Sequence, residues 1–165
     1  MKKLLVVAVL LIATAALASD DKKGISISFN SSDPRTHLGP RLDARQARLA
    51  ITNHDGTVSL LLMNDVVAIQ LSDHALAGIS TKDDGGMLEE LLASTVRTVL
   101  RKAIEYPVAD ISSAEIEDGA LVLSNDKNQP IFTNVKVNGR DVLRDFPLAD
   151  AARFVHAFRA LKNQR

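Results

Sequence analysis

Four arginines lie close together in the first third of the chain, and their side chains have the clearest potential to bind a ligand. They are Arg35, Arg41, Arg45 and Arg48. Residues 30–45 contain two prolines, a glycine and no periodic pattern of apolar residues, which predicts a long loop with room for one turn of helix. Long loops in compact domains are often functional, and a guanidinium group fits a carboxylate or a phosphate, for example on a lipid or a cell-wall polymer. Asp33 and Asp43 lie among these arginines, so a solvated segment of neutralised charges is the simpler alternative.

The histidines are too widely spaced to indicate a metal site. His37, His54, His74 and His156 are separated by 17, 20 and 82 residues, whereas metal sites favour close pairs such as two histidines one helical turn apart. The chain also has no cysteine. The sequence therefore predicts no metal and no cofactor, and a site built from His54, His74 and Asp73 is the alternative.

Two short motifs contain the residue types of a catalytic or calcium site but not the spacing. Ser72-Asp73-His74 contains the three residue types of a catalytic triad, but in consecutive positions. A catalytic triad is assembled from side chains of separate segments. Asp83-Asp84-Gly85-Gly86 has acidic residues before a predicted helix, but Glu89 and Glu90 come too early for a 12-residue calcium loop. The sequence therefore predicts no catalytic residues.

The N-terminus has the pattern of a secretory signal peptide. Lys2 and Lys3 precede 15 uncharged residues, which end in Ala16-Leu17-Ala18. A membrane span needs about 20 apolar residues, so the short run favours cleavage after Ala18 and leaves no stable span. The sequence predicts a bacterial signal peptide over residues 1–18 and a single periplasmic or secreted domain over residues 19–165.

The composition of the predicted mature domain excludes several classes of partner. Lys2 and Lys3 leave with the signal peptide, so 18 of the 20 basic residues remain against 20 acidic ones, a net charge of −2. Such a balance does not favour nucleic acid or an anionic membrane surface as the partner. Without disulfides, packing alone must stabilise this domain.

Eight segments have the apolar alternation or the flanking turns expected of strands. They are residues 25–29, 48–52, 58–63, 66–71, 110–116, 120–124, 131–137 and 141–146. Apolar residues at helical spacing predict one amphipathic helix over residues 87–105 and a second from Pro147 to Lys162. The predicted order is four strands, a helix, four strands and a helix, which indicates an α+β fold of antiparallel hairpins with two helices.

The last third resembles a pleckstrin-homology-type domain, in which antiparallel hairpins end in one amphipathic helix. The resemblance rests on residues 111–119, the Asn138-Gly139 turn, and Phe146-Pro147-Leu148 leading into residues 154–158. It implies a barrel closed by the C-terminal helix, although that helix has no tryptophan and a further helix is predicted in mid-chain.

These observations favour a non-enzymatic domain that binds another protein or an envelope component, as inhibitor, immunity and adaptor proteins do. An envelope hydrolase or metal-dependent enzyme using His54, His74 and scattered carboxylates is the alternative. A lipid carrier is a third interpretation, and it requires a large apolar cavity.

Overall fold

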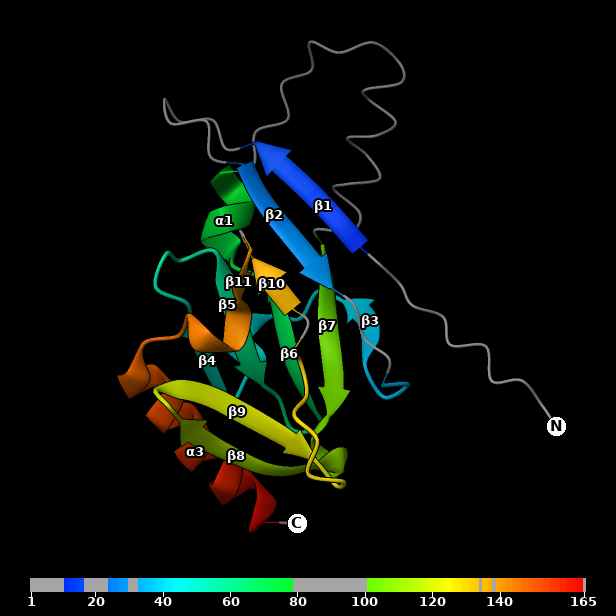
Figure 1. The fold of residues 1–165 in the computed structure, drawn as a ribbon, viewed down its shortest axis with the longest axis vertical. Coiled ribbons are helices and arrows are strands. Elements are labelled where there is room, and N and C mark those ends of the chain that lie inside the picture. Colours follow the sequence, from blue (N-terminus) through cyan, green and yellow to red (C-terminus); the bar gives the residue numbers. More distant parts are fainter. Residues whose placement is uncertain are drawn as a thin grey trace, which may run out of the picture.

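The fold combines antiparallel sheets with a long C-terminal helix (Figure 1). The computed structural model describes residues 11–16, 24–29, 33–78, 101–133, 135–137 and 139–164. Within them lie a five-stranded sheet, a four-stranded sheet and a two-stranded hairpin. The predicted α+β class is confirmed.

The five-stranded sheet is built from neighbouring antiparallel strands in the order β3-β7-β6-β5-β4. Its strands are β3 (His37–Pro40), β4 (Leu49–Thr52), β5 (Val58–Leu62), β6 (Val66–Leu71) and β7 (Lys102–Pro107). Three of the predicted strands appear as β4, β5 and β6. The turn between β4 and β5 places Gly56 at a φ of 74°, which glycine adopts without strain.

The predicted loop over residues 30–45 is wrong at β3, which is a strand. The turn of helix that the prediction allowed corresponds to the start of a 3-10 helix, η1 (Ala44–Gln46), which Asp43 caps by accepting from the Arg45 backbone N–H. Strand β3 has no apolar alternation because Gly39 and Pro40 occupy two of its four positions, so the sequence pattern hides it.

The helix predicted over residues 87–105 is also wrong at its C-terminal end, where β7 begins at Lys102. Residues 87–100 lie outside the described residues. Ala103, Ile104, Glu105 and Tyr106 are all buried, because both faces of the sheet are covered at this strand. A strand buried on both faces has a continuous apolar run, which periodicity cannot separate from a buried helix. A short helix, α1 (Asp73–Gly78), follows β6 and was not predicted.

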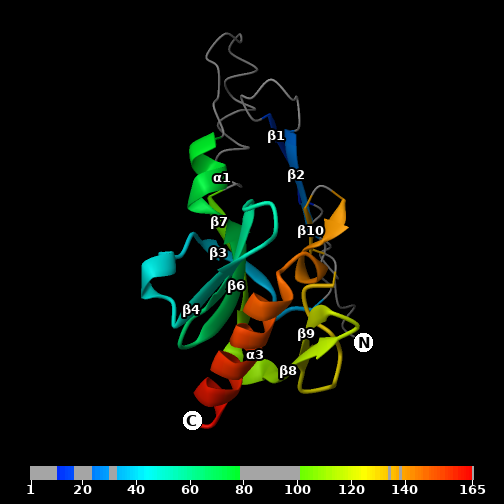
Figure 2. The same cartoon turned by 90° about the vertical axis from the view of Figure 1, so that its left-hand side faces the viewer.

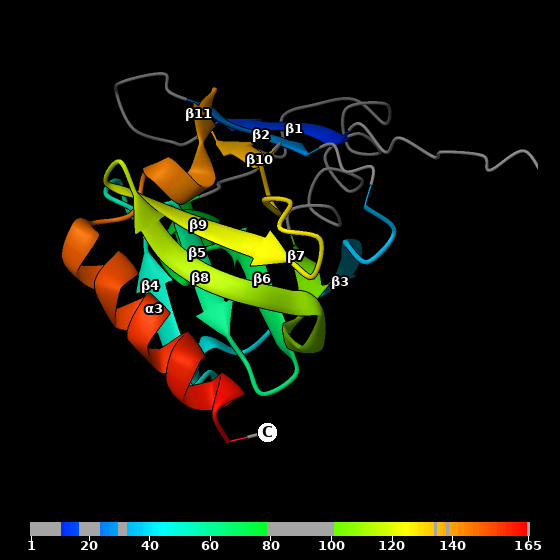
Figure 3. The ribbon, with the colours of Figure 1, turned by 60° about the horizontal axis from the view of Figure 1, so that its bottom comes forward.

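A β-hairpin and the C-terminal helix pack over one face of the five-stranded sheet. The hairpin consists of β8 (Ile111–Glu117) and β9 (Ala120–Asn125), and a 3-10 helix, η2 (Val108–Asp110), connects it to β7. The helix α3 (Leu148–Lys162) lies between the β4 side of the sheet and the hairpin (Figures 2 and 3). Its Phe154 and Phe158 are fully buried in the core that all three parts share.

The remaining strands form the four-stranded sheet in the order β1-β2-β10-β11. They are β1 (Leu11–Ala16), β2 (Gly24–Phe29), β10 (Val135–Val137) and β11 (Arg140–Asp141). Strand β1 lies within the predicted signal peptide and pairs antiparallel with β2. No helix in the described part of the chain is long and apolar enough to cross a membrane.

Two of the predicted strands are shorter than expected. The segment 131–137 becomes β10 only from Val135, because Phe132 has a φ of 59° and turns the chain away. The segment 141–146 contains a 3-10 helix, η3 (Val142–Arg144), in which the Asp141 carboxylate accepts from the Leu143 N–H at 3.0 Å. A local side-chain cap therefore overrides the strand pattern there.

The β3–β7 pair contains a buried carboxylate that fits against a glycine. Glu105 is opposite His37 in the register, and its Oε2 lies 3.1 Å from His37 Nε2. Its Oε1 is buried without a hydrogen-bond partner among the described residues. A Cβ on Gly39 would lie 1.9 Å from this Oε1, so any other residue at this position would require the carboxylate to move.

Replacing Gly39 by alanine should therefore lower the free energy of unfolding by about 1–3 kcal/mol, because the buried carboxylate must move. Denaturant unfolding measures this loss. In a Glu105→Ala background, Gly39→Ala should reduce the free energy of unfolding by at least about 1 kcal/mol less than in the wild type, because the carboxylate that clashes with the new Cβ is absent. Equal costs in both backgrounds would contradict this explanation.

Candidate functional site

The four arginines predicted to bind a ligand do not form one cluster. Arg35 belongs to a group of side chains that joins the segment before β3 to β7 and to the end of the hairpin. Its guanidinium donates to both oxygens of Asp33 at 3.0 Å and to Asp126 at 2.6 Å. It also lies over the Tyr106 ring, 5.4 Å from the centroid. The Arg35 guanidinium is therefore already paired with neighbouring side chains.

The same group strongly favours the ionised form of Asp33. The hydrogen bonds from Arg35 hold the pKa of the Asp33 carboxyl well below its usual range, although burial acts in the opposite direction. The buried Tyr106 hydroxyl donates to Asp33 Oδ2 at 2.9 Å. Burial, followed by this hydrogen bond, raises the pKa of Tyr106. We interpret the group as a structural connection between distant parts of the chain.

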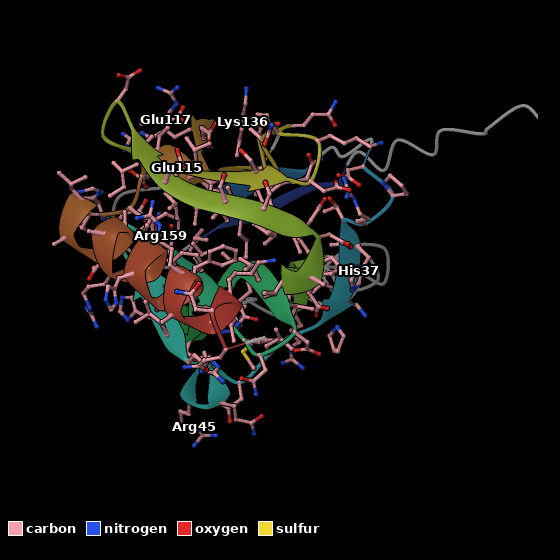
Figure 4. All side chains as sticks on the ribbon, turned by 90° about the horizontal axis from the view of Figure 1, so that it is seen from below. His37, Arg45, Glu115, Glu117, Lys136 and Arg159 are labelled. Atoms are coloured by element: carbon pink, nitrogen blue, oxygen red, sulfur yellow. The ribbon has the colours of Figure 1, made fainter. Side chains whose placement is uncertain are left out.

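Arg41 and Arg45 are also paired with carboxylates. Arg41 donates to the Leu71 carbonyl and to Asp73 at 2.6 Å, so it joins the segment after β3 to the start of α1. Arg45 donates to both oxygens of Asp43, at 3.0 and 2.8 Å. The Arg45 side chain is 89% exposed, and it projects from the edge of the molecule (Figure 4).

Arg48 differs from the other three because its partners are neutral. It donates to Asn64 Oδ1 at 2.6 Å and to Gln164 Oε1 at 3.1 Å. Among the described residues no carboxylate forms an ion pair with it. Two amide oxygens thus orient the guanidinium, and no carboxylate in the described part of the chain balances its positive charge.

Arg48 borders a shallow hollow of about 470 Å³ between the start of β4 and one face of α3, which we call the α3–β4 hollow. Its lining consists of Arg48, Leu49, Ala152, Arg153, His156 and Ala157. The four helix residues lie one turn apart in two pairs, so they share a face of α3. Arg153 pairs with Asp150 at 3.0 Å. The hollow therefore combines an apolar floor with two guanidinium groups and an imidazole.

Arg153 and His156 were not predicted from the sequence to line a site. Both lie beside the buried stripe of α3, where polar residues are normally a solvated face. Their three-residue spacing places them together on the helix, but only the packing of α3 against β4 brings Arg48 to them. That contact joins residues more than 100 positions apart, and no local pattern indicates it.

Two residues of the catalytic and metal alternatives, Ser72 and His54, have structural partners. Ser72 Oγ accepts from the Ala75 N–H at 3.0 Å at the start of α1 and donates to the Gly56 carbonyl. His54 Nδ1 lies 2.7 Å from the Asp145 carbonyl oxygen. Within the described ranges, no group of three or more His, Cys, Asp or Glu side chains could hold a metal ion.

We expect Asp33→Asn to lower the free energy of unfolding by about 1.5–3 kcal/mol at neutral pH, because it removes a charged acceptor. The folded-state pKa of Asp33 is depressed, so its stabilisation is present above the unfolded pKa of about 3.9 and is lost as the pH falls further. The difference in the free energy of unfolding between the wild type and Asp33→Asn should therefore become smaller below about pH 4. Urea unfolding over a pH series measures it, and the exposed Asp65→Asn is the control. A difference that stays constant down to pH 2 would contradict this role.

Comparisons with known proteins give no indication of function, so the function is inferred from the geometry of the structure. No protein-family model, no curated protein and no solved structure matches this chain. The resemblance to pleckstrin-homology-type domains is not confirmed.

Proposed function

We propose that residues 19–165 form an exported domain of the bacterial envelope, which binds an acidic segment of a partner protein in the α3–β4 hollow. The observation that carries the proposal is the charge of Arg48, which has neutral hydrogen-bond partners while Arg35, Arg41 and Arg45 are paired with carboxylates. A carboxylate from another molecule would supply the missing opposite charge.

The hollow favours an anion for two further reasons. Asn64 and Gln164 hold the guanidinium of Arg48 in place, so less side-chain entropy is lost when a ligand binds. Leu49, Ala152 and Ala157 supply apolar surface beside the charges. A bound segment that covers this surface excludes water, and charge–charge attraction is stronger where water is excluded.

The shape of the hollow favours a segment of a protein. It is open and lies along a helix face, so it suits an extended chain with several acidic side chains better than an enclosed small molecule. Arg153 is partly neutralised by Asp150. Arg48 should therefore contribute most of the attraction.

The export part of the proposal rests on the N-terminal pattern of basic residues, an uncharged run and Ala16-Leu17-Ala18. Expression of the full chain in a Gram-negative host should yield a periplasmic protein that begins at Ser19. Mass spectrometry of the periplasmic fraction identifies this N-terminus. Intact protein beginning at Met1 in the cytosolic fraction would contradict export.

Binding through Arg48 can be tested with poly-L-glutamate as the acidic probe. Arg48→Ala should weaken binding of fluorescently labelled poly-L-glutamate by about fivefold, equivalent to about 1 kcal/mol for a partly exposed charge. Fluorescence anisotropy at low salt measures the affinity, which should fall as salt is added. Arg45→Ala is the matched control because Arg45 is exposed, carries the same charge and lies outside the hollow. Equal losses for the two variants, or none for Arg48→Ala, would contradict the assignment.

A further inference from the structure

A second opening lies at the β8–β9 hairpin, away from the α3–β4 hollow. It is a cleft of about 240 Å³ between β9, the segment 130–133 and the residues of β11 and η3. We call it the hairpin cleft. It shares no lining residue with the α3–β4 hollow, so an inference about it does not depend on the proposed function.

The floor of the hairpin cleft is apolar and its rim is acidic. Leu121, Ile131 and Leu143 line it and are at most 6% exposed. Glu117 and Asp118 belong to the lining at the turn of the hairpin, where both are exposed. The cleft thus changes from apolar to acidic toward solvent.

The charges that line the cleft are mostly negative. Glu117, Asp118 and Asp141 supply three carboxylates, and Arg144 supplies the single basic group in the lining. Asp141 uses one oxygen to accept from the Leu143 N–H at 3.0 Å. No ion pair joins Arg144 to these carboxylates within the described part of the chain. The lining therefore has an excess of two negative charges.

We propose that the hairpin cleft receives a lysine or arginine side chain of a partner protein. Such a side chain has an apolar stem and a cationic tip. The side chain would lie along the cleft, with its stem on Leu121, Ile131 and Leu143 and its tip beside Glu117 and Asp118 at the hairpin turn. A purely apolar side chain would leave the carboxylates without a counter-charge, and an anionic one would be repelled.

The backbone holds one wall of the cleft in a fixed shape. Phe132 lies between two lining residues, Ile131 and Thr133, and has a φ of 59°. A bulky residue rarely adopts this left-handed conformation unless its surroundings enforce it. The Phe132 ring packs edge-on against Tyr106, with 6.1 Å between the ring centroids. Packing therefore holds Phe132 in this conformation and supports the shape of the wall.

The probe is N-acetyl-lysine methylamide, added to the isotope-labelled protein purified after export. NMR chemical shifts should change in residues 117–123, 131–133 and 141–144, with a Kd in the millimolar range as expected for a single side chain. N-acetyl-norleucine methylamide has the stem without the charge and should bind at least about threefold more weakly. Shift changes confined to other residues, or equal binding of the two probes, would overturn the proposal.

The double variant Glu117→Gln/Asp118→Asn removes the rim charges and should weaken the lysine probe by about threefold or more. Asp118 has a φ of 49°, and asparagine tolerates this conformation, so the turn should persist. Glu115→Gln is the matched control: Glu115 is exposed on the same strand two residues before Glu117 but does not line the cleft (Figure 4). An unchanged affinity in the double variant, or an equal loss in Glu115→Gln, would overturn the proposal.

Discussion

The packing of one helix into the space between a sheet and a hairpin is the constraint on which the rest of this structure depends. The chain has no cysteine, so burial and the polar contacts of Arg35 hold the five-stranded sheet and the β8–β9 hairpin together without a disulfide. Phe154 and Phe158 of α3 fill the shared core. Because α3 contacts both β4 and β8, its position also fixes where surface residues from distant parts of the chain meet.

The helix and the hairpin create two surfaces of opposite charge in a chain with almost no net charge. At the α3–β4 hollow, Arg48 lies beside four residues of α3, and two amides orient its guanidinium, with no ion pair to a carboxylate among the described residues. At the hairpin cleft, carboxylates of the β8–β9 turn lie beside an apolar floor. The total charge is balanced, but the two surfaces produce local electrostatic potentials of opposite sign. These potentials influence which partner binds.

Local patterns predicted much of the fold but little of the site. The strand segments of β4 to β6, the two strands of the β8–β9 hairpin and the apolar stripe of α3 are indicated by neighbouring residues, and each prediction is confirmed. Strand β7 was mistaken for the end of a helix because both its faces are buried. The four arginines were predicted to form one cluster. In the folded chain, Arg35 contacts Asp126 and Arg48 contacts Gln164, and the positions of these residues in the sequence indicate neither contact.

We propose above all that the charge of Arg48, with which no described carboxylate pairs, allows the α3–β4 hollow to bind an acidic segment. The most direct measurement is an NMR shift map of the exported protein during titration with a short oligoglutamate peptide. We expect the largest changes at Arg48, at Leu49 and along the exposed face of α3 from Ala152 to Ala157. Changes spread evenly over all the arginines, or strongest at Arg45, would contradict the claim, because they would show attraction to charge without a site.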